Sequence, residues 1–205
     1  MVAKKTLKRW KQYSKISDVG QITRRYFVMN AFDGALTMLG VVIGAYVSGI
    51  LEQSTVIISA GIAGSVAMGV SGVSGAYMTE KAERTKKLKD LEKAMLKDMK
   101  NGLHRKSHRF ATIFAAVVDG VSPALAAMLV VSPFFLANFG IISSELAFFA
   151  CIIITLIVLS LLGVYLAKIS DESMLKYGIL MLIVGLITAF LCVGTSILLG
   201  GHIPV

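Results

Sequence analysis

Long apolar runs dominate the pattern of hydrophobic and polar positions along the chain. Five blocks each contain a run of about 20 or more residues with at most one charge, long enough at ~1.5 Å per residue to cross a ~30 Å hydrocarbon core. The pattern predicts five transmembrane helices, Phe27–Ile50, Thr55–Thr79, Phe110–Ala137, Glu145–Ala167 and Met174–Leu199. A membrane β-barrel would alternate polar and apolar residues in segments of about ten. The predicted fold class is therefore an all-α membrane protein.

The composition supports this prediction and excludes other classes. Of 205 residues, 56% are hydrophobic and 16% are charged, whereas a soluble domain averages about 45–50% apolar and about 25% charged residues. A soluble enzyme, a nucleic-acid-binding module and a disordered tail are excluded despite the net charge of +9. Residues 1–26 are basic but contain no apolar core, so we do not expect a cleavable signal. Cys151 and Cys192 lie inside apolar spans and indicate no disulfide framework.

The basic residues predict the orientation in the membrane. Eight of the 21 Lys and Arg residues lie in residues 1–26, eleven in residues 80–109 and two in the loop after the fourth span. All of them fall on one face, which the positive-inside rule makes cytoplasmic, and the C-terminus is then outside. This charge indicates attraction to anionic lipid headgroups, with no nucleic acid as a partner.

The resulting organisation has five parts. Residues 1–26 form a basic cytoplasmic N-terminal segment, and residues 27–79 hold transmembrane helices one and two. Residues 80–109 form a basic cytoplasmic helical linker, in which Asn101-Gly102 is expected to stop the helix. Residues 110–199 hold helices three to five, and residues 200–205 form an external tail.

An internal repeat is visible in the first four spans. Asp33-Gly34 and Asp119-Gly120 each follow a basic and aromatic segment and about two turns of apolar helix. A second pair is Gly75–Glu80 and Gly163–Lys168. We expect two hairpins related by a parallel repeat, with a fifth helix added, as in secondary transporters whose sites lie near the repeat interface. The alternative is that glycine and aromatic residues simply recur in helical membrane proteins.

The two aspartates are the first candidate functional residues. A carboxylate near a helix centre costs roughly 2.5–3.5 kcal/mol on insertion scales, and such residues mark ion paths or proton relays. Asn30, Asp33 and Thr37 follow at helical spacing and share one face, so we expect them to line a transport path. Asp119 is a second candidate metal ligand. The alternative for each aspartate is a hydrogen bond to a neighbouring helix.

Met68, Glu80 and Glu83 complete the candidate metal ligands. The thioether of Met68 suits soft or borderline transition metals, although a methionine in a membrane helix is also common filler. Glu80 and Glu83 stand at the membrane exit of the second span, where they can receive cations or form salt bridges with Arg84 and other basic neighbours. His104 and His108 have chelating spacing, but the basic residues around them oppose binding of a divalent cation.

Two enzyme hypotheses fail on the motifs. Gly69-Val70-Ser71-Gly72 matches an intramembrane serine-protease pattern, but that chemistry needs a base near the serine, and all three histidines lie outside the predicted spans. An aspartyl-protease dyad needs two paired carboxylates in Gly-x-Gly-Asp and Tyr-Asp motifs, whereas this chain has Asp-Gly. We therefore expect no enzyme and no catalytic residue.

Three motifs together resemble the vacuolar iron transporter family. They are Asp33-Gly34 in the first span, Ala67-Met68-Gly69 with its glycine-rich continuation to Tyr77 and Glu80, and Ser132-Pro133-Phe134-Phe135 at the end of the third span. The resemblance covers most of residues 24–199, including the five spans and the cytoplasmic segment after the second.

The resemblance implies a homodimeric exchanger that moves Fe²⁺, and often Mn²⁺, out of the cytoplasm against protons. By position, the family's path residues fall on Asp33 and Met68, near the dimer axis, while Asp119 has no firm counterpart. The family's glutamate-rich metal-binding domain is absent or reduced here, because the linker is short and basic. We expect a cell-membrane protein, with a vacuole-like membrane as the alternative location and a non-transporting scaffold as the alternative function.

Overall fold

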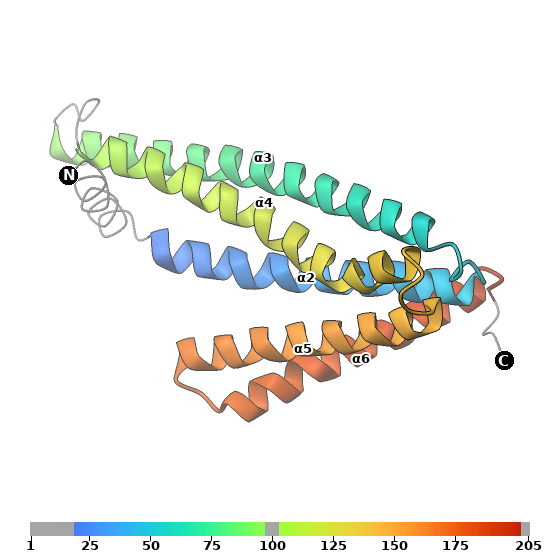
Figure 1. Ribbon diagram of the computed structural model, residues 1–205. Helices are drawn as coiled ribbons and strands as arrows, with labels where there is room; N and C mark the ends of the chain where they lie inside the picture. Colours follow the sequence, from blue (N-terminus) through green and yellow to red (C-terminus); the bar gives the residue numbers. More distant parts are fainter. Residues whose placement is uncertain (1–18, 97–102, 202–205) are drawn as a thin grey trace, which may run out of the picture. The chain divides into compact units, whose positions relative to one another are not determined.

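The computed structural model describes residues 19–96 and 103–201, without the side chains of residues 103 and 104. Within these ranges the chain forms five helices, α2 (Val19–Val47), α3 (Ser54–Met95), α4 (Leu103–Asn138), α5 (Ser144–Ser170) and α6 (Met174–Leu198) (Figure 1). Each corresponds to one predicted span, although α2 and α6 end before the predicted Ile50 and Leu199. Each is long and apolar enough to cross a membrane. The predicted all-α membrane fold is confirmed, whereas the repeat and the orientation stay predictions.

Two of the helices end two residues before a glycine in left-handed conformation, and the hydropathy pattern did not predict these ends. Helix α2 ends at Val47, before the predicted Ile50, because Gly49 has a φ of +71°. The N–H of Ile50 then donates to the carbonyl of Ala45 at 3.1 Å and closes the helix. Gly140 has the same φ beyond the end of α4. Left-handed backbone at such a position favours glycine and stops the helix whatever its neighbours' hydropathy.

Helix α3 continues from its apolar span into the basic segment, as predicted. It ends at Met95, before the expected stop at Asn101-Gly102, which lies outside the described residues. Helix α4 already begins at Leu103. The basic linker is thus shared between the end of α3 and the start of α4, so its charged side chains belong to two helices.

The chain divides into two compact units. The larger comprises residues 28–68 and 122–201, and the smaller comprises residues 19–27, 69–96 and 103–121. In the larger unit α2, α4 and α5 share one hydrophobic core, which includes the fully buried Val42, Phe134 and Leu159. The rings of Tyr46 and Phe148 stack at 4.4 Å and join α2 to α5.

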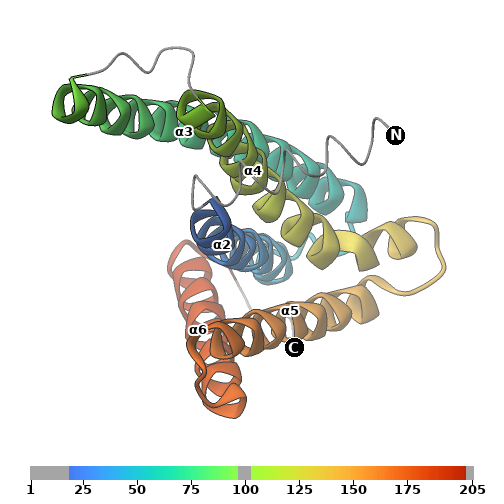
Figure 2. The ribbon, with the colours of Figure 1, turned by 90° about the vertical axis from the view of Figure 1, so that its left-hand side faces the viewer.

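Helices α5 and α6 pack against each other within the larger unit (Figure 2). Two glycines permit the contact: a Cβ atom at Gly163 would lie 2.6 Å from the carbonyl oxygen of Tyr177, and one at Gly185 would lie 2.6 Å from a methyl carbon of Leu159. Much of the remaining surface of α6 is apolar, as at Leu180 and Phe190. Such a surface suits lipid and not water.

In the smaller unit α3 and α4 approach closely at another pair of glycines. A Cβ atom at Gly72 would lie only 2.8 Å from the Cα atom of Gly120. Small residues let two membrane helices approach to backbone contact, which gains dispersion energy where lipid supplies no hydrophobic driving force. This crossing holds together the two helices that carry the basic segment.

The α5–α6 packing generates a stability prediction. Gly163→Ala places a methyl group against the backbone of Tyr177, and overpacking of this kind costs typically about 1–3 kcal/mol. Gly194→Ala is the matched control, because Gly194 lies in the same unit within α6 and has no atom within 4 Å of the added carbon. We expect Gly163→Ala to lower the midpoint of thermal unfolding in detergent and Gly194→Ala to leave it equal or higher. Equal midpoints for the two variants would contradict the packing.

Candidate metal path

The position of Asp33 follows from the packing of the glycine beside it. A Cβ atom at Gly34 would overlap the carbonyl oxygen of Pro123 and lie 2.7 Å from its Cα atom, so α2 and α4 meet here in backbone contact. Consecutive residues of a helix point about 100° apart. With Gly34 directed at α4, the side chain of Asp33 is directed away from this contact, and Asp33 is exposed.

The other two predicted path residues lie on the same helix face as Asp33. Thr37 is exposed and Asn30 is half-buried. The opposite face of α2 carries the buried core residues Ala35, Met38 and Val42. The helix therefore has an apolar face toward the core of the larger unit and a short polar stretch directed away from it, as the spacing predicted.

Met68 lies on α3 at the edge of the same core. It is half-buried and packs against the buried cluster of the larger unit. Part of its side chain therefore serves as packing, which was the alternative that the sequence left open. Because the side chain is only half-buried, its packing does not exclude metal binding at this residue.

Glu80 has the most completely defined surroundings of the predicted ligands. It is only 4% exposed and accepts hydrogen bonds from the hydroxyl of Tyr26 at 3.1 Å and from Nε of Arg84 at 2.8 Å. Arg84 is buried as well, so the ion pair is shielded from water. A metal cation can bind the carboxylate of Glu80 only by replacing the guanidinium group of Arg84.

Glu83 and Glu80 differ in environment although they are one turn apart on α3. Glu83 is exposed, whereas Glu80 is turned toward Tyr26 of α2. The structure does not bring the two carboxylates together around one space. In this arrangement Glu83 is the carboxylate that can attract a cation directly.

Asp119 lies in the smaller unit, beside the crossing of α3 and α4. It is half-buried, and its Oδ2 atom lies 3.0 Å from where a Cβ atom of Gly72 would be. The following Gly120 is packed against the Gly69 carbonyl and Val73. Both Asp-Gly pairs therefore place the glycine at a close helix crossing, but Asp33 is exposed where Asp119 is half-buried.

The prolines of α4 lie within a continuous helix, at Pro123 and Pro133. A proline leaves the carbonyl four residues earlier without its usual donor. For Pro133 this is the carbonyl of Leu129, and the hydroxyl of Ser132 donates to it at 2.7 Å. The hydroxyl of Ser132 therefore replaces the backbone donor that Pro133 lacks, and the carbonyl of Leu129 does not need a bound cation as a partner.

Ligand clustering within one copy is limited. Among the described residues, no group of three or more His, Cys, Asp or Glu side chains lies in metal-binding proximity. His108 lies between Arg105 and Arg109 in sequence, and the side chain of His104 is outside the described part, so the chelating pair cannot be placed.

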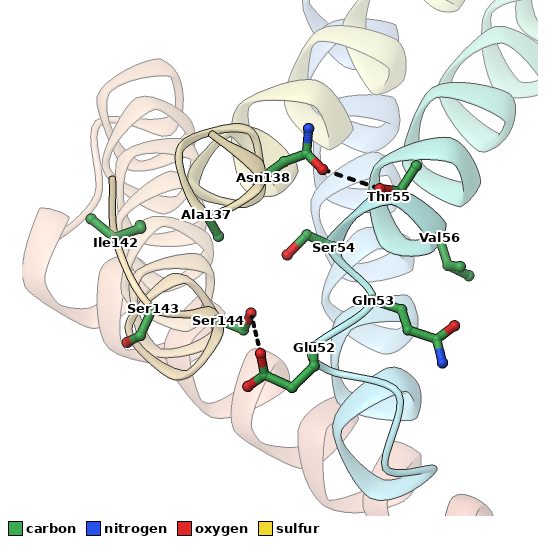
Figure 3. Close-up of a pocket in the computed structure, with 10 residues that line it drawn as sticks. All are labelled: Glu52, Gln53, Ser54, Thr55, Val56, Ala137, Asn138, Ile142, Ser143 and Ser144. Carbon is green, nitrogen blue, oxygen red and sulfur yellow. Dashed lines mark hydrogen bonds between the residues drawn. The ribbon is translucent and has the colours of Figure 1, made fainter. Parts of the chain in front are cut away.

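A polar pocket that sequence reasoning missed lies in the larger unit, where α2 is joined to α3 and α4 to α5 (Figure 3). It has a volume of about 550 Å³. Figure 3 shows two hydrogen bonds across it, from Thr55 to Asn138 at 3.1 Å and from Ser144 to Glu52 at 3.3 Å. The available signal was the run of short polar residues at the starts of α3 and α5. These bonds tie the two connections together.

Comparison with known proteins identifies the family. The VIT family model matches residues 85–197, more than half of the chain. An uncharacterized protein from Methanocaldococcus jannaschii is 39% identical over 178 residues, which cover 84% of this chain and 88% of that protein. The chain belongs to the VIT family.

Membership in the VIT family confirms the resemblance drawn from the motifs. It implies a membrane protein of metal transport and not an enzyme. The match begins at residue 85, within the basic part of α3, and therefore includes Asp119 but neither Asp33 nor Met68. The relative from Methanocaldococcus jannaschii extends the similarity over most of the chain.

The Glu80–Arg84 pair generates a second prediction. Arg84→Gln leaves the buried carboxylate of Glu80 without its cation, and breaking a buried pair from one side costs about 3–5 kcal/mol. The double variant Glu80→Gln/Arg84→Gln removes both charges and is expected to recover part of that loss. Thermal unfolding in detergent measures both. A double variant that is less stable than Arg84→Gln alone would contradict a charge-pair role.

Proposed function

We propose that this VIT family protein moves Fe²⁺ or Mn²⁺ out of the cytoplasm in exchange for protons. The observation that carries the proposal is the exposed carboxylate of Asp33 within a helix that is long and apolar enough to span a membrane. Metal transport follows from the family. The metals, the direction and the exchange with protons are what the resemblance implies, and the chemistry of the residues supports the exchange.

An exposed aspartate at this position needs a partner that lipid does not offer. Placing it against hydrocarbon costs roughly 2.5–3.5 kcal/mol. Nothing in the helix requires an acid here, because the close crossing uses Gly34 and the core uses the opposite face. A hydrated path for cations accounts for both the charge and its exposure.

The ligand set fits a transition metal better than Ca²⁺ or Mg²⁺. Asp33 supplies a hard oxygen ligand, which Mn²⁺ prefers, and Met68 a softer thioether, which suits Fe²⁺ better than it suits Ca²⁺ or Mg²⁺. Asn30 and Thr37 contribute neutral oxygens on the Asp33 face. Asn30 and Thr37 can coordinate a cation without adding negative charge, so the metal is not held too tightly to leave.

Exchange with protons follows from the chemistry of a single carboxylate on the path. Such a group is stabilised by a cation or by a proton, and the two compete for it. A proton arriving from outside displaces the metal from Asp33, and a metal arriving from the cytoplasm displaces the proton. On the cytoplasmic side, Glu83 attracts the cation, Glu80 accepts it on release from Arg84, and Asp119 provides a further carboxylate in the smaller unit.

A homodimer in the cell membrane is the assembly that suits this path. The Asp33 face of α2 is polar and exposed in one copy, and a second copy would cover it and contribute its own Asp33 and Met68. Two carboxylates and two thioethers make a fuller coordination shell than one of each.

A non-transporting scaffold is the second candidate function, favoured by the surface of α3. Ala63, Ala67 and Ser71 are small and exposed on this helix, which suits packing against another membrane helix. A scaffold binds no metal at equilibrium, and Asp33→Asn leaves its assembly unchanged. Metal binding in detergent therefore separates the two candidates.

The proposal predicts a loss of flux on substitution of the path residues. In proteoliposomes, Fe²⁺ or Mn²⁺ flux driven by a pH gradient is expected to fall at least about tenfold in Asp33→Asn and in Met68→Ala, since loss of a bound-ion contact worth ~1.4 kcal/mol gives a factor of ten. Collapsing the pH gradient with a protonophore is expected to slow the unsubstituted protein as well.

Matched controls make the same chemical changes elsewhere. Asp171→Asn changes an exposed aspartate at a position with left-handed backbone. Asparagine also tolerates this conformation. Met174→Ala changes an exposed methionine at the start of α6. Both are expected to transport normally. Unchanged flux in Asp33→Asn and Met68→Ala, with the protein correctly inserted, would refute the path assignment.

A further inference from the structure

A second pocket lies in the smaller unit, between the parts of α3 and α4 that carry the basic segment. It has a volume of about 570 Å³. Five cationic side chains line it, Lys81, Arg84, Lys89, Arg105 and Arg109, together with His108. Among its lining residues Glu92 is the one acid. The pocket shares Arg84 with the path proposed above, in which Glu80 accepts metal on release from that residue, but its strong positive charge opposes a cationic ligand.

The helical spacing explains why these charges converge. On α3, Lys81, Arg84 and Lys89 fall on one face with Thr85, and on α4 Arg105 and Arg109 are one turn apart, with Thr112 next along the face. Pairing of the two helices places the two basic faces on opposite walls of one pocket. Like charges held in this way repel one another, and an anion between them removes that cost.

Arg84 gives the pocket a fixed element. It is only 7% exposed, and Glu80 holds its Nε atom at 2.8 Å. The guanidinium is planar, so this bond at one nitrogen fixes the direction of the rest of the group, which belongs to the pocket wall. A guanidinium held in one orientation presents a fixed positive charge to an oxyanion in the pocket.

The remaining lining residues suit a phosphate group and not an arbitrary anion. The hydroxyl of Thr85 can donate to a phosphate oxygen, whereas that of Thr112 already donates to the carbonyl of His108 at 3.0 Å. The ammonium groups of Lys81 and Lys89 neutralise the charge of the phosphate. The ring of Tyr77 lies 5.5 Å from Nζ of Lys81 and sets the position of that ammonium. Tyr77 and Thr112 belong to the predicted spans, whereas the cations lie beyond them, at the level where lipid phosphates are found.

We propose that this pocket binds a phosphate group, carried either by an anionic lipid of the cytoplasmic leaflet or by a soluble phosphate. The proposal does not depend on the metal path. It gives the basic residues of this segment a binding role in addition to setting the orientation of the protein in the membrane.

The test uses the full purified chain and two probes. Native mass spectrometry measures retention of phosphatidylglycerol and of phosphatidylcholine, and equilibrium dialysis at constant ionic strength measures inorganic phosphate. The pocket variants are Lys81→Gln/Lys89→Gln and Arg105→Gln/Arg109→Gln, which alter exposed side chains and keep Arg84. The matched control is Lys86→Gln/Lys87→Gln, which removes two exposed charges from the same helix outside the pocket. Circular dichroism confirms that each variant is folded.

We expect the pocket variants to lose affinity for the bound probe at least about tenfold, given that each Lys or Arg near an anionic surface contributes several-fold, while the control changes less than about twofold. Retention of phosphatidylglycerol over phosphatidylcholine identifies the lipid as the source, and binding of inorganic phosphate identifies a soluble ligand. Binding of neither probe by the unsubstituted chain, or an equal loss in the Lys86/Lys87 control, would overturn the proposal.

Discussion

The close crossing of α2 and α4 at Gly34 is the contact on which the functional account depends. Because the backbone of α2 lies directly against Pro123, the rotation of α2 is fixed, and with it the direction of every side chain on that helix. The apolar residues then face the core and Asp33 is directed away from it. The exposed acid is thus a consequence of helix packing, and its cost in lipid is what calls for a hydrated path.

Three acids that look equivalent in the sequence differ in the structure. Asp33 is exposed, Asp119 is half-buried beside Gly72, and Glu80 is buried in an ion pair with Arg84. An acid that must alternate between a metal and a proton cannot also hold a permanent cationic partner. The arrangement therefore favours Asp33 as the acid that exchanges metal for a proton. Glu80 has to break its ion pair with Arg84 before it can bind metal. Arg84 also lines the phosphate pocket.

The sequence predicted the five helices because the length and polarity of a membrane span are set by the bilayer and can be counted directly. It did not predict the end of α2, which depends on the backbone angle of Gly49 and not on hydropathy. The burial of Glu80 was also out of reach, since its partner Tyr26 is 54 residues away. The charges of the basic pocket were visible in the sequence, but only the pairing of α3 with α4 brings Lys81 and Arg105 to one pocket.

The most direct test of the central claim is the water accessibility of position 33. In a background with Cys151→Ala and Cys192→Ala, Asp33→Cys is treated with a charged, membrane-impermeant thiol reagent in proteoliposomes, and Phe190→Cys on the apolar surface of α6 serves as the control. The account predicts rapid modification at position 33 and negligible modification at position 190. A position 33 as unreactive as position 190 would contradict it, because the acid would then face lipid and no path would reach it.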